Sequence, residues 1–262
     1  MAIEWLAGKR ARGTNSERTE ITITTTVTDD FTPQLTWGQT GDKYSISGGK
    51  VQCAGYSSYN PNDFVYYDLG ASYHAFDNDW TLKLKTFKSS TANSYLEFGI
   101  TSDISNGDGG SMINGSVNIG GGSNNYPRIN GAYGGTVYEH VTGSPNSGWD
   151  NVVYSELKFD KATNNVTQKG FTNSDYSTGQ IGSTLTYTIT PSNYSGMRYI
   201  FIGAITGTGR TDSSATYADD LDFTYTSTSV PTFNIQDGTI FEETDTNKAY
   251  IWSSSSQTWT QL

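Results

Sequence analysis

Short segments in which apolar and polar residues alternate recur along the chain. In residues 80–87 (WTLKLKTF), Trp80, Leu82 and Leu84 share one face, and Lys83 faces the other way. A period of two is the period of a β-strand with one buried and one wet face. Such segments dominate the chain, and no segment keeps a helical period over three turns. The alternation therefore predicts an all-β fold.

The predicted strands are separated by clusters of Asn, Gly, Ser and Asp. Alternation predicts strands at residues 19–27, 65–69, 80–87, 95–101, 152–159, 185–189, 198–204 and 221–225. The longest polar clusters, residues 102–110 and 114–125, are predicted to be surface loops, because they lack bulky side chains. Many short strands with Gly-rich turns are typical of a sandwich or a barrel.

The composition excludes several classes of protein. The net charge is −10 with 16 Lys and Arg among 262 residues, so a phosphate-neutralising surface is absent and nucleic-acid binding is not expected. The single cysteine, Cys53, excludes an internal disulfide and multi-cysteine metal sites. No apolar stretch approaches the ~18 residues of a membrane span, so we expect no membrane insertion.

The N-terminus predicts release without a cleaved signal. Its apolar residues precede its charges, which is the reverse of a secretory signal. The rest of the chain is rich in Thr, Ser, Gly, Asn and Tyr, a composition typical of extracellular proteins. We therefore expect an extracellular protein that is synthesised without a secretory signal.

Three regions are predicted along the chain. Residues 1–28 form an N-terminal arm and first strand, residues 29–228 form the main domain, and residues 229–262 form a C-terminal β-hairpin module. Pro231 interrupts the strand pattern between the last two regions. An isolated piece of two or three strands is marginally stable in water, so the module must pack on the main domain or on a neighbouring chain.

The main domain resembles the concanavalin A-like, laminin-G-like jelly rolls. Six segments carry the resemblance: residues 29–31 (DDF), 66–70 (YYDLG), 80–87 (WTLKLKTF), 96–103 (LEFGITSD), 197–205 (MRYIFIGAI) and 218–226 (ADDLDFTYT). The resemblance implies a two-sheet antiparallel jelly-roll sandwich, here with an N-terminal arm and a C-terminal β-hairpin extension. It also implies that the first and last strands of the domain lie side by side in one sheet.

The two ends of the chain carry a second resemblance. Residues 5–18 (WLAGKRARGTNSER) and 238–252 (GTIFEETDTNKAYIW) are similar to segments that flank such domains in structural proteins of viruses of prokaryotes. This resemblance implies a location in a virion, which lysis or budding releases without a signal peptide. Other virion proteins are then expected partners.

Acidic residues open and close the main domain and suggest one structural calcium ion. They are Asp29 and Asp30 at the start and Asp219, Asp220 and Asp222 at the end. If the end strands pair, these carboxylates come close together, and calcium prefers such hard oxygen ligands. Jelly-roll binding modules of the resembled family often carry a structural calcium there. The alternative is that these residues cap turns and face solvent.

Four aromatic residues are candidates for binding host-surface glycans. Tyr126, Tyr133, Tyr138 and Trp149 lie in or beside Gly/Asn-rich segments. The resemblance places lectin sites in loops at one end of the sandwich. The alternative is that these rings cover sheet edges or pack at subunit contacts, where Tyr and Trp are also enriched.

Both ends of the chain are candidates for contacts between copies in a homo-oligomer. The candidate residues are Arg10, Arg12, Ile21 and Ile23 in the arm and Phe241, Tyr250 and Trp252 in the hairpin module. A strand of the arm can add to the sheet of another subunit. The alternative is a solvated tail.

Catalysis is not predicted. Glycoside hydrolysis needs two carboxyl groups across the scissile bond, and glucan-cleaving members of the resembled family carry Glu-x-Asp-x-x-Glu, a spacing that Glu97 and Glu156 do not match. His74, His140 and Cys53 stand outside any catalytic motif.

The sequence as a whole predicts a non-enzymatic virion structural protein on the capsid surface or in a tail fibre. It would oligomerise through its termini and contact host-surface glycans. Two alternatives stay open, a cellular surface-filament subunit or carbohydrate-binding module, and a glycan-active enzyme with a displaced carboxylate pair.

Overall fold

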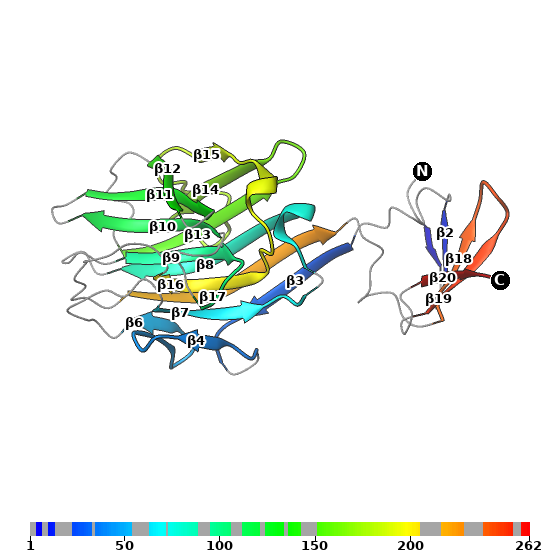
Figure 1. Ribbon diagram of the computed structural model, residues 1–262, viewed down its shortest axis with the longest axis horizontal. Coiled ribbons are helices and arrows are strands. Elements are labelled where there is room, and N and C mark those ends of the chain that lie inside the picture. Colours follow the sequence, from blue (N-terminus) through cyan, green and yellow to red (C-terminus); the bar gives the residue numbers. More distant parts are fainter. Residues whose placement is uncertain are drawn as a thin grey trace. The chain divides into compact units, whose positions relative to one another are not determined.

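The computed structural model describes a chain that is nearly all β (Figure 1). The described residues are 4–6, 10–13, 23–32, 35–53, 63–71, 73–88, 95–105, 112–120, 124–133, 136–142, 151–204, 216–227, 238–253 and 258–262. Among these residues, the short 3-10 turns η1 (Ala75–Asp77) and η3 (Pro191–Asn193) interrupt the strands. The described residues contain no helix of the length and apolarity that a bilayer crossing requires.

The chain divides into two compact units. The larger unit comprises Thr26–Thr224, and the smaller unit combines Met1–Thr25 with Tyr225–Leu262. The sequence of the larger unit is therefore inserted between the two parts of the smaller unit.

The larger unit contains two sheets. The eight-stranded sheet has the order β15 (Leu185–Thr188), β14 (Asn165–Phe171), β13 (Asn151–Asp160), β8 (Asp79–Lys88), β17 (Thr216–Ser227), β6 (Val51–Cys53) and β5 (Tyr44–Ile46), and β3 (Ile23–Asp29) also pairs with β17. The seven-stranded sheet has the order β12 (Thr136–Thr142), β11 (Asn124–Tyr133), β10 (Met112–Gly120), β9 (Tyr95–Thr101), β16 (Tyr199–Ala204), β7 (Asp63–Asp68) and β4 (Gly38–Thr40). Strand β11 lies against β14 and β15, and β5 lies against β7, so the sheets pack as two layers (Figure 1). The predicted antiparallel two-sheet sandwich is confirmed.

Strand β8 shows why alternation predicts the core. Trp80, Leu82 and Leu84 are at most 1% exposed, whereas Lys83 on the other face is half-buried. In the neighbouring strand β13, Leu157 lies opposite Leu82. Directly opposed residues share a face of a sheet, so both leucines enter the layer between the sheets.

The first and last strands of the sandwich pair with each other, as the resemblance implies. Strand β3 pairs with β17, and the Oγ1 atoms of Thr26 and Thr224 are 3.3 Å apart. This pairing brings the two ends of the larger unit together in one sheet.

The loop predicted at residues 114–125 is wrong. Strands β10 and β11 pair through this region, from Met112 opposite Ala132 to Gly120 opposite Asn124. Strand β10 also pairs with β9, where Val117 lies opposite Leu96. Because β10 has a partner on each side, its backbone groups are satisfied despite the poor strand propensity of Gly and Asn.

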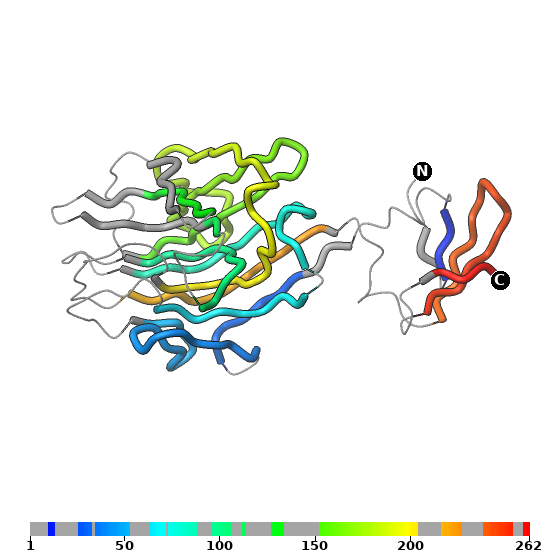
Figure 2. The backbone as a smooth tube through the Cα atoms, viewed as in Figure 1, coloured from blue at the N-terminus to red at the C-terminus, as the bar shows by residue number. Residues whose placement is uncertain are grey.

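The smaller unit is a five-stranded sheet built from both ends of the chain. Its order is β1 (Glu4–Leu6), β2 (Arg10–Gly13), β18 (Ile240–Glu243), β19 (Ala249–Ser253) and β20 (Thr258–Gln261). Strand β2 pairs with β18 in parallel, with Ala11 opposite Phe241. In Figure 2 the blue N-terminal strand lies beside the orange and red C-terminal strands. The arm therefore supplies two strands to the C-terminal hairpin within one chain.

Aromatic packing and hydrogen bonds hold this small sheet together. Phe241 and Trp252 are at most 1% exposed, and the Trp259 ring lies 5.9 Å from Phe241 and 5.3 Å from Trp252, between ring centroids. At the end of β2, the carbonyl of Gly13 accepts hydrogen bonds from the Thr244 amide at 2.7 Å and hydroxyl at 3.2 Å. The turn between β18 and β19 thus anchors the arm.

Candidate functional site

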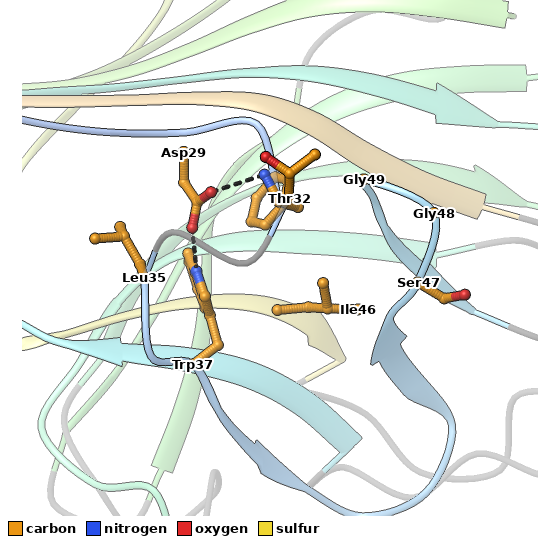
Figure 3. Close-up of a pocket in the computed structure, with 9 residues that line it drawn as sticks. Asp29, Thr32, Leu35, Trp37, Ile46, Ser47, Gly48 and Gly49 are labelled. Atoms are coloured by element: carbon orange, nitrogen blue, oxygen red, sulfur yellow. Dashed lines mark hydrogen bonds between the residues drawn. The ribbon is translucent and has the colours of Figure 1, made fainter.

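A cavity of about 510 Å³ opens at the edge of the sandwich (Figure 3). Its walls come from three segments, the turn after β3, the approach to β4, and β5 with the turn that follows it. The lining residues are Asp29, Phe31, Thr32, Leu35, Trp37, Ile46, Ser47, Gly48 and Gly49. All nine belong to the larger unit. The cavity is of the size of typical small-molecule sites, about 300–1,000 Å³.

Asp29 fixes the positions of two cavity walls. Asp29 is 4% exposed; one carboxylate oxygen accepts a hydrogen bond from the Phe31 amide at 2.8 Å, and the other accepts one from the Trp37 indole N–H at 2.6 Å (Figure 3). Phe31 has a positive φ of 55°, which is uncommon for a residue with a side chain. The bond from its amide to Asp29 is an Asx-type turn, which stabilises this conformation. A charged hydrogen bond then orients the indole.

Aromatic rings form the apolar part of the cavity. The Trp37 ring centroid lies 5.3 Å from that of Phe31 and 5.8 Å from that of Tyr67. Trp37 is half-buried, so part of its indole remains accessible. Leu35 and Ile46 complete this side of the cavity.

The rim of the cavity supplies polar groups. Thr32 and Ser47 are exposed and carry hydroxyls. Gly49 has a φ of 72°, and a Cβ there would lie 3.4 Å from the Asp30 carbonyl oxygen, so a glycine suits this turn. The cavity can therefore bind a ligand that has one apolar face and a polar edge.

Three of the five aspartates predicted to bind calcium, Asp29, Asp30 and Asp222, accept hydrogen bonds from other groups. Besides Asp29, Asp30 accepts hydrogen bonds from the Thr32 hydroxyl and amide, which lower the pKa of its carboxyl. Asp222 accepts a hydrogen bond from the Thr224 hydroxyl at 3.0 Å.

Lys85 compensates the charge of the other two aspartates. Its Nζ lies 3.5 Å from a carboxylate oxygen of Asp219 and 3.7 Å from one of Asp220. Burial alone would lower the pKa of Lys85, but the two carboxylates raise it above its ordinary value. Within the described part of the chain, no group of three or more His, Cys, Asp or Glu could hold a metal ion. The calcium ion stays a prediction.

The predicted sugar-binding aromatics do not all lie together. Tyr126 and Tyr133 belong to strand β11, near its opposite ends, and Tyr138 lies in β12 opposite Gly131. Tyr133 is half-buried, and its ring packs edge-on against Tyr194 with centroids 5.3 Å apart. The side chains of Tyr126 and Tyr138, and all of Trp149, lie outside the described residues.

The residues predicted to contact other copies are placed within one chain. Both Arg10 and Arg12 pair with Glu242, the latter at 3.2 Å. Phe241, Trp252 and the half-buried Tyr250 belong to the small sheet. Ile21 and the side chain of Ile23 lie outside the described residues. Contacts between copies stay a prediction.

The acidic residues considered for catalysis lie in different sheets. Glu97 belongs to β9 of the seven-stranded sheet, and Glu156 belongs to β13 of the eight-stranded sheet. Glu156 lies 3.8 Å from the Lys169 ammonium. His74 is half-buried, and its Nε2 accepts the Gly196 amide at 3.3 Å.

Sequence reasoning did not find the Trp37 cavity. Trp37 lies between Thr36 and Gly38, in a segment where no strand was predicted. A large aromatic residue beside a glycine, outside a predicted strand, is the signal that could have drawn attention to it.

Comparison with known proteins places the fold. The sequence matches no protein-family model and no curated protein. Among solved structures, the lectin of Bauhinia forficata in complex with GalNAc is 9% identical and superposes with a TM-score of 0.52, covering 79% of this chain and 100% of the lectin. The fold is a concanavalin A-like jelly roll.

Two further structures share this jelly roll. Lectin I of Ulex europaeus, in complex with the methyl glycoside of α-L-fucose, is 11% identical with a TM-score of 0.53, covering 78% of this chain and 98% of the lectin. The CBM2 module of the evolved Dit of Lactobacillus casei BL23 phage J-1 is 12% identical with a TM-score of 0.51, covering 78% of this chain and 96% of the module. The concanavalin A-like jelly roll is thus shared by plant and phage proteins, and at these identities the similarity concerns the fold.

Proposed function

We propose that this protein is a non-enzymatic structural protein of a virion that binds host-surface glycans, and that the Trp37 cavity receives the sugar. The observation that carries the proposal is the half-buried Trp37 indole, which Asp29 fixes at the wall of a cavity of about 510 Å³. The cavity lies at the edge of a concanavalin A-like jelly roll.

A pyranose ring matches the chemistry of this cavity. One face of the ring presents C–H groups, which pack on an aromatic ring, and its edge carries hydroxyls. Trp37 and Phe31 offer the aromatic wall, while Thr32 and Ser47 offer hydroxyls at the rim. Both oxygens of Asp29 are already engaged. Asp29 therefore orients Trp37 and leaves direct hydrogen bonds with the sugar to the rim.

The structural neighbours support the proposal in two respects. The Bauhinia and Ulex lectins were solved with sugars, and the phage J-1 module is named as a carbohydrate-binding module. The latter is part of a phage protein, which supports the virion location proposed here. Lectins and carbohydrate-binding modules also agree with a role without catalysis.

Attachment through glycans would depend on copy number. A single shallow sugar site binds weakly, but many linked copies bind a surface with an avidity that exceeds each affinity by orders of magnitude. The smaller unit, built from both chain ends, is the part proposed to contact other copies or other virion proteins. The larger unit, inserted between those ends, would present the sugar site.

A glycan array with the full-length protein tests the sugar site. Trp37→Ala should strongly reduce the array signal, and Trp37→Phe should reduce it less, because phenylalanine retains a ring but loses the hydrogen bond to Asp29. Tyr154→Ala is a matched control, since Tyr154 is also half-buried but lies in β13, packs against Tyr176 after β14, and does not line the cavity. A blank array for the folded protein, or equal signals for Trp37→Ala and the parent, contradicts the proposal.

Imaging of native particles tests the location, and density for this chain in a cellular filament would contradict a virion role.

A further inference from the structure

A second group of aromatic and charged side chains lies where β7 ends and β16 begins. Tyr66 and Asp68 belong to β7, Tyr199 opens β16, and Arg198 directly precedes it. Tyr199 lies opposite Asp68 in the sheet, and Phe201 lies opposite Tyr66. The side chains of these four residues, from β7 and from the start of β16, are thus close together.

This group faces away from the Trp37 cavity. Tyr67 contacts Trp37, whose cavity is also lined by Ile46 of the eight-stranded sheet. Tyr67 therefore points toward the inside of the sandwich. Successive side chains of a strand point to opposite faces, so Tyr66 points to the outer face of the seven-stranded sheet.

A row of aromatic rings supports the outer face. Phe64 and Phe201 are fully buried with centroids 5.8 Å apart, and Phe64 lies 6.3 Å from Tyr66. Tyr66 in turn lies 5.9 Å from Tyr199 at an interplanar angle of 86°. Both tyrosines are half-buried. The buried rings of Phe64 and Phe201 hold the row in place, and Tyr66 and Tyr199 at its other end are partly accessible.

Gly38 makes room for Tyr66. A Cβ at Gly38 would lie 2.1 Å from the Cζ atom of Tyr66. Only a residue without a side chain lets this ring lie across strand β4. Gly38 thus allows the ring position of Tyr66.

Arg198 and Asp68 form a charge pair beside the tyrosines. The guanidinium carbon of Arg198 lies 4.7 Å from the Tyr199 ring centroid, and Nη2 donates to the Tyr199 hydroxyl and pairs with an Asp68 oxygen at 3.2 Å. The other oxygen of Asp68 accepts the Gly70 amide at 2.8 Å. Among the described residues, neither Nη1 of Arg198 nor the Tyr66 hydroxyl has a partner. The side chains of Arg198 and Asp68 are 31% and 43% exposed.

The geometry points to a second sugar site, which takes a neutral pyranose with adjacent hydroxyls. One sugar hydroxyl would donate to Asp68 and its neighbour would accept from Nη1 of Arg198, while the C–H face of the ring packs on Tyr66 and Tyr199. The pair is neutral overall, and the exposed Asp68 carboxylate would repel a sulfated or carboxylated sugar. This inference shares with the proposed function only the class of ligand, since the site uses none of the cavity residues.

The test combines variants of both sites in the full-length protein, on an array of neutral, sulfated and sialylated oligosaccharides. The neutral glycan with the strongest signal is then titrated calorimetrically. Trp37→Ala should leave residual binding of neutral glycans. In that background, Arg198→Lys should weaken the affinity by about tenfold or more, because lysine lacks the planar fork that holds two partners. Lys158→Arg is the control for an exchange of lysine and arginine away from both sites, since Lys158 is exposed in β13.

The outcomes separate the two sites. Loss of all binding in Trp37→Ala, unchanged affinity in Arg198→Lys, or a preference for sulfated glycans overturns the second site. Binding that survives Trp37→Ala unchanged but falls in Arg198→Lys supports the second site and contradicts the cavity. Gly38→Ala would displace the Tyr66 ring, so it should weaken glycan affinity as Arg198→Lys does. If Gly38→Ala does not fold, the affinity of Arg198→Lys alone decides the test.

Discussion

Thr26 and Thr224 place their Oγ1 atoms 3.3 Å apart, although 198 residues separate them in the sequence. Their strands, β3 and β17, close the sandwich at the point where the chain passes between its two units. The ends of the chain then continue into a single small sheet. Each of the two units has its own core, which can be tested separately.

The core of the smaller unit depends on Phe241. Phe241→Ala removes a fully buried ring and should destabilise this unit by about 3–5 kcal/mol. Ile240→Ala, on the opposite face and half-buried, should cost much less. Denaturant unfolding followed by hydrogen exchange measures both. Loss of protection in β2 and β18, with β8 and β13 unchanged, is expected, whereas equal loss in both units would show that the units are not separate.

Acid should release the N-terminal strand. Hydrogen bonds from Arg12 and then Arg10 lower the pKa of Glu242 below its ordinary value. A lowered folded-state pKa gives stability that is present above the unfolded pKa, about 4.3 for Glu, and is lost as the pH falls through the folded pKa. Exchange of the β2 amides should therefore accelerate below about pH 4, relative to their intrinsic rates. Glu242→Gln should remove this pH dependence, and an identical profile in both proteins would contradict the assignment.

Alanine variants of Gly203 and Gly48 distinguish the free-energy cost of a steric clash from that of backbone strain. A Cβ at Gly203 would lie 2.6 Å from the Phe64 Cα atom, whereas a Cβ at Gly48 would meet nothing within 4 Å. Both glycines have positive φ, so both alanine variants pay conformational strain. Gly203→Ala should cost about 1–3 kcal/mol more than Gly48→Ala, because β7 and β16 must move apart. Equal unfolding midpoints for the two variants would show that the contact is not tight.

Lys85 is expected to neutralise the acidic end of β17. Lys85→Met leaves Asp219 and Asp220 without their described cation and should lower the stability by about 1 kcal/mol at neutral pH. Added Ca²⁺ should restore part of the melting midpoint in the variant. An unchanged midpoint in Lys85→Met would contradict the role of the lysine.

A melt of the parent protein with chelator tests the calcium prediction. A lower melting midpoint would support the prediction, and an unchanged midpoint would reject it.

Alternation predicted those strands whose own sequence alternates, whatever strands they pair with. The prediction for β9 matches at both ends, residues 95–101, because Leu96, Phe98 and Ile100 face one way and are buried. Strands β10 and β11 carry Gly and Asn, and they are strands because of their neighbours in the sheet. A pattern within one segment does not contain that information.

Strand β2 and the cavity were missed for a related reason. Strand β2 gains its place from a parallel partner more than 200 residues away, with Gly13 opposite Glu243. Asp29 was singled out from the sequence, but as a metal ligand. Its described partner, the Trp37 indole, lies eight residues further along the chain. The identity of a partner across a turn depends on backbone geometry, which residue types alone do not specify.

The indole N–H resonances of the six tryptophans offer the most direct test of the sugar site. In a two-dimensional nitrogen–proton spectrum of the full-length protein, Trp37→Phe assigns one of these signals. Titration with a neutral oligosaccharide that binds on the array should move the Trp37 signal first and furthest, because its indole forms the cavity wall. A Trp37 signal that stays still while the protein binds the sugar would contradict the account.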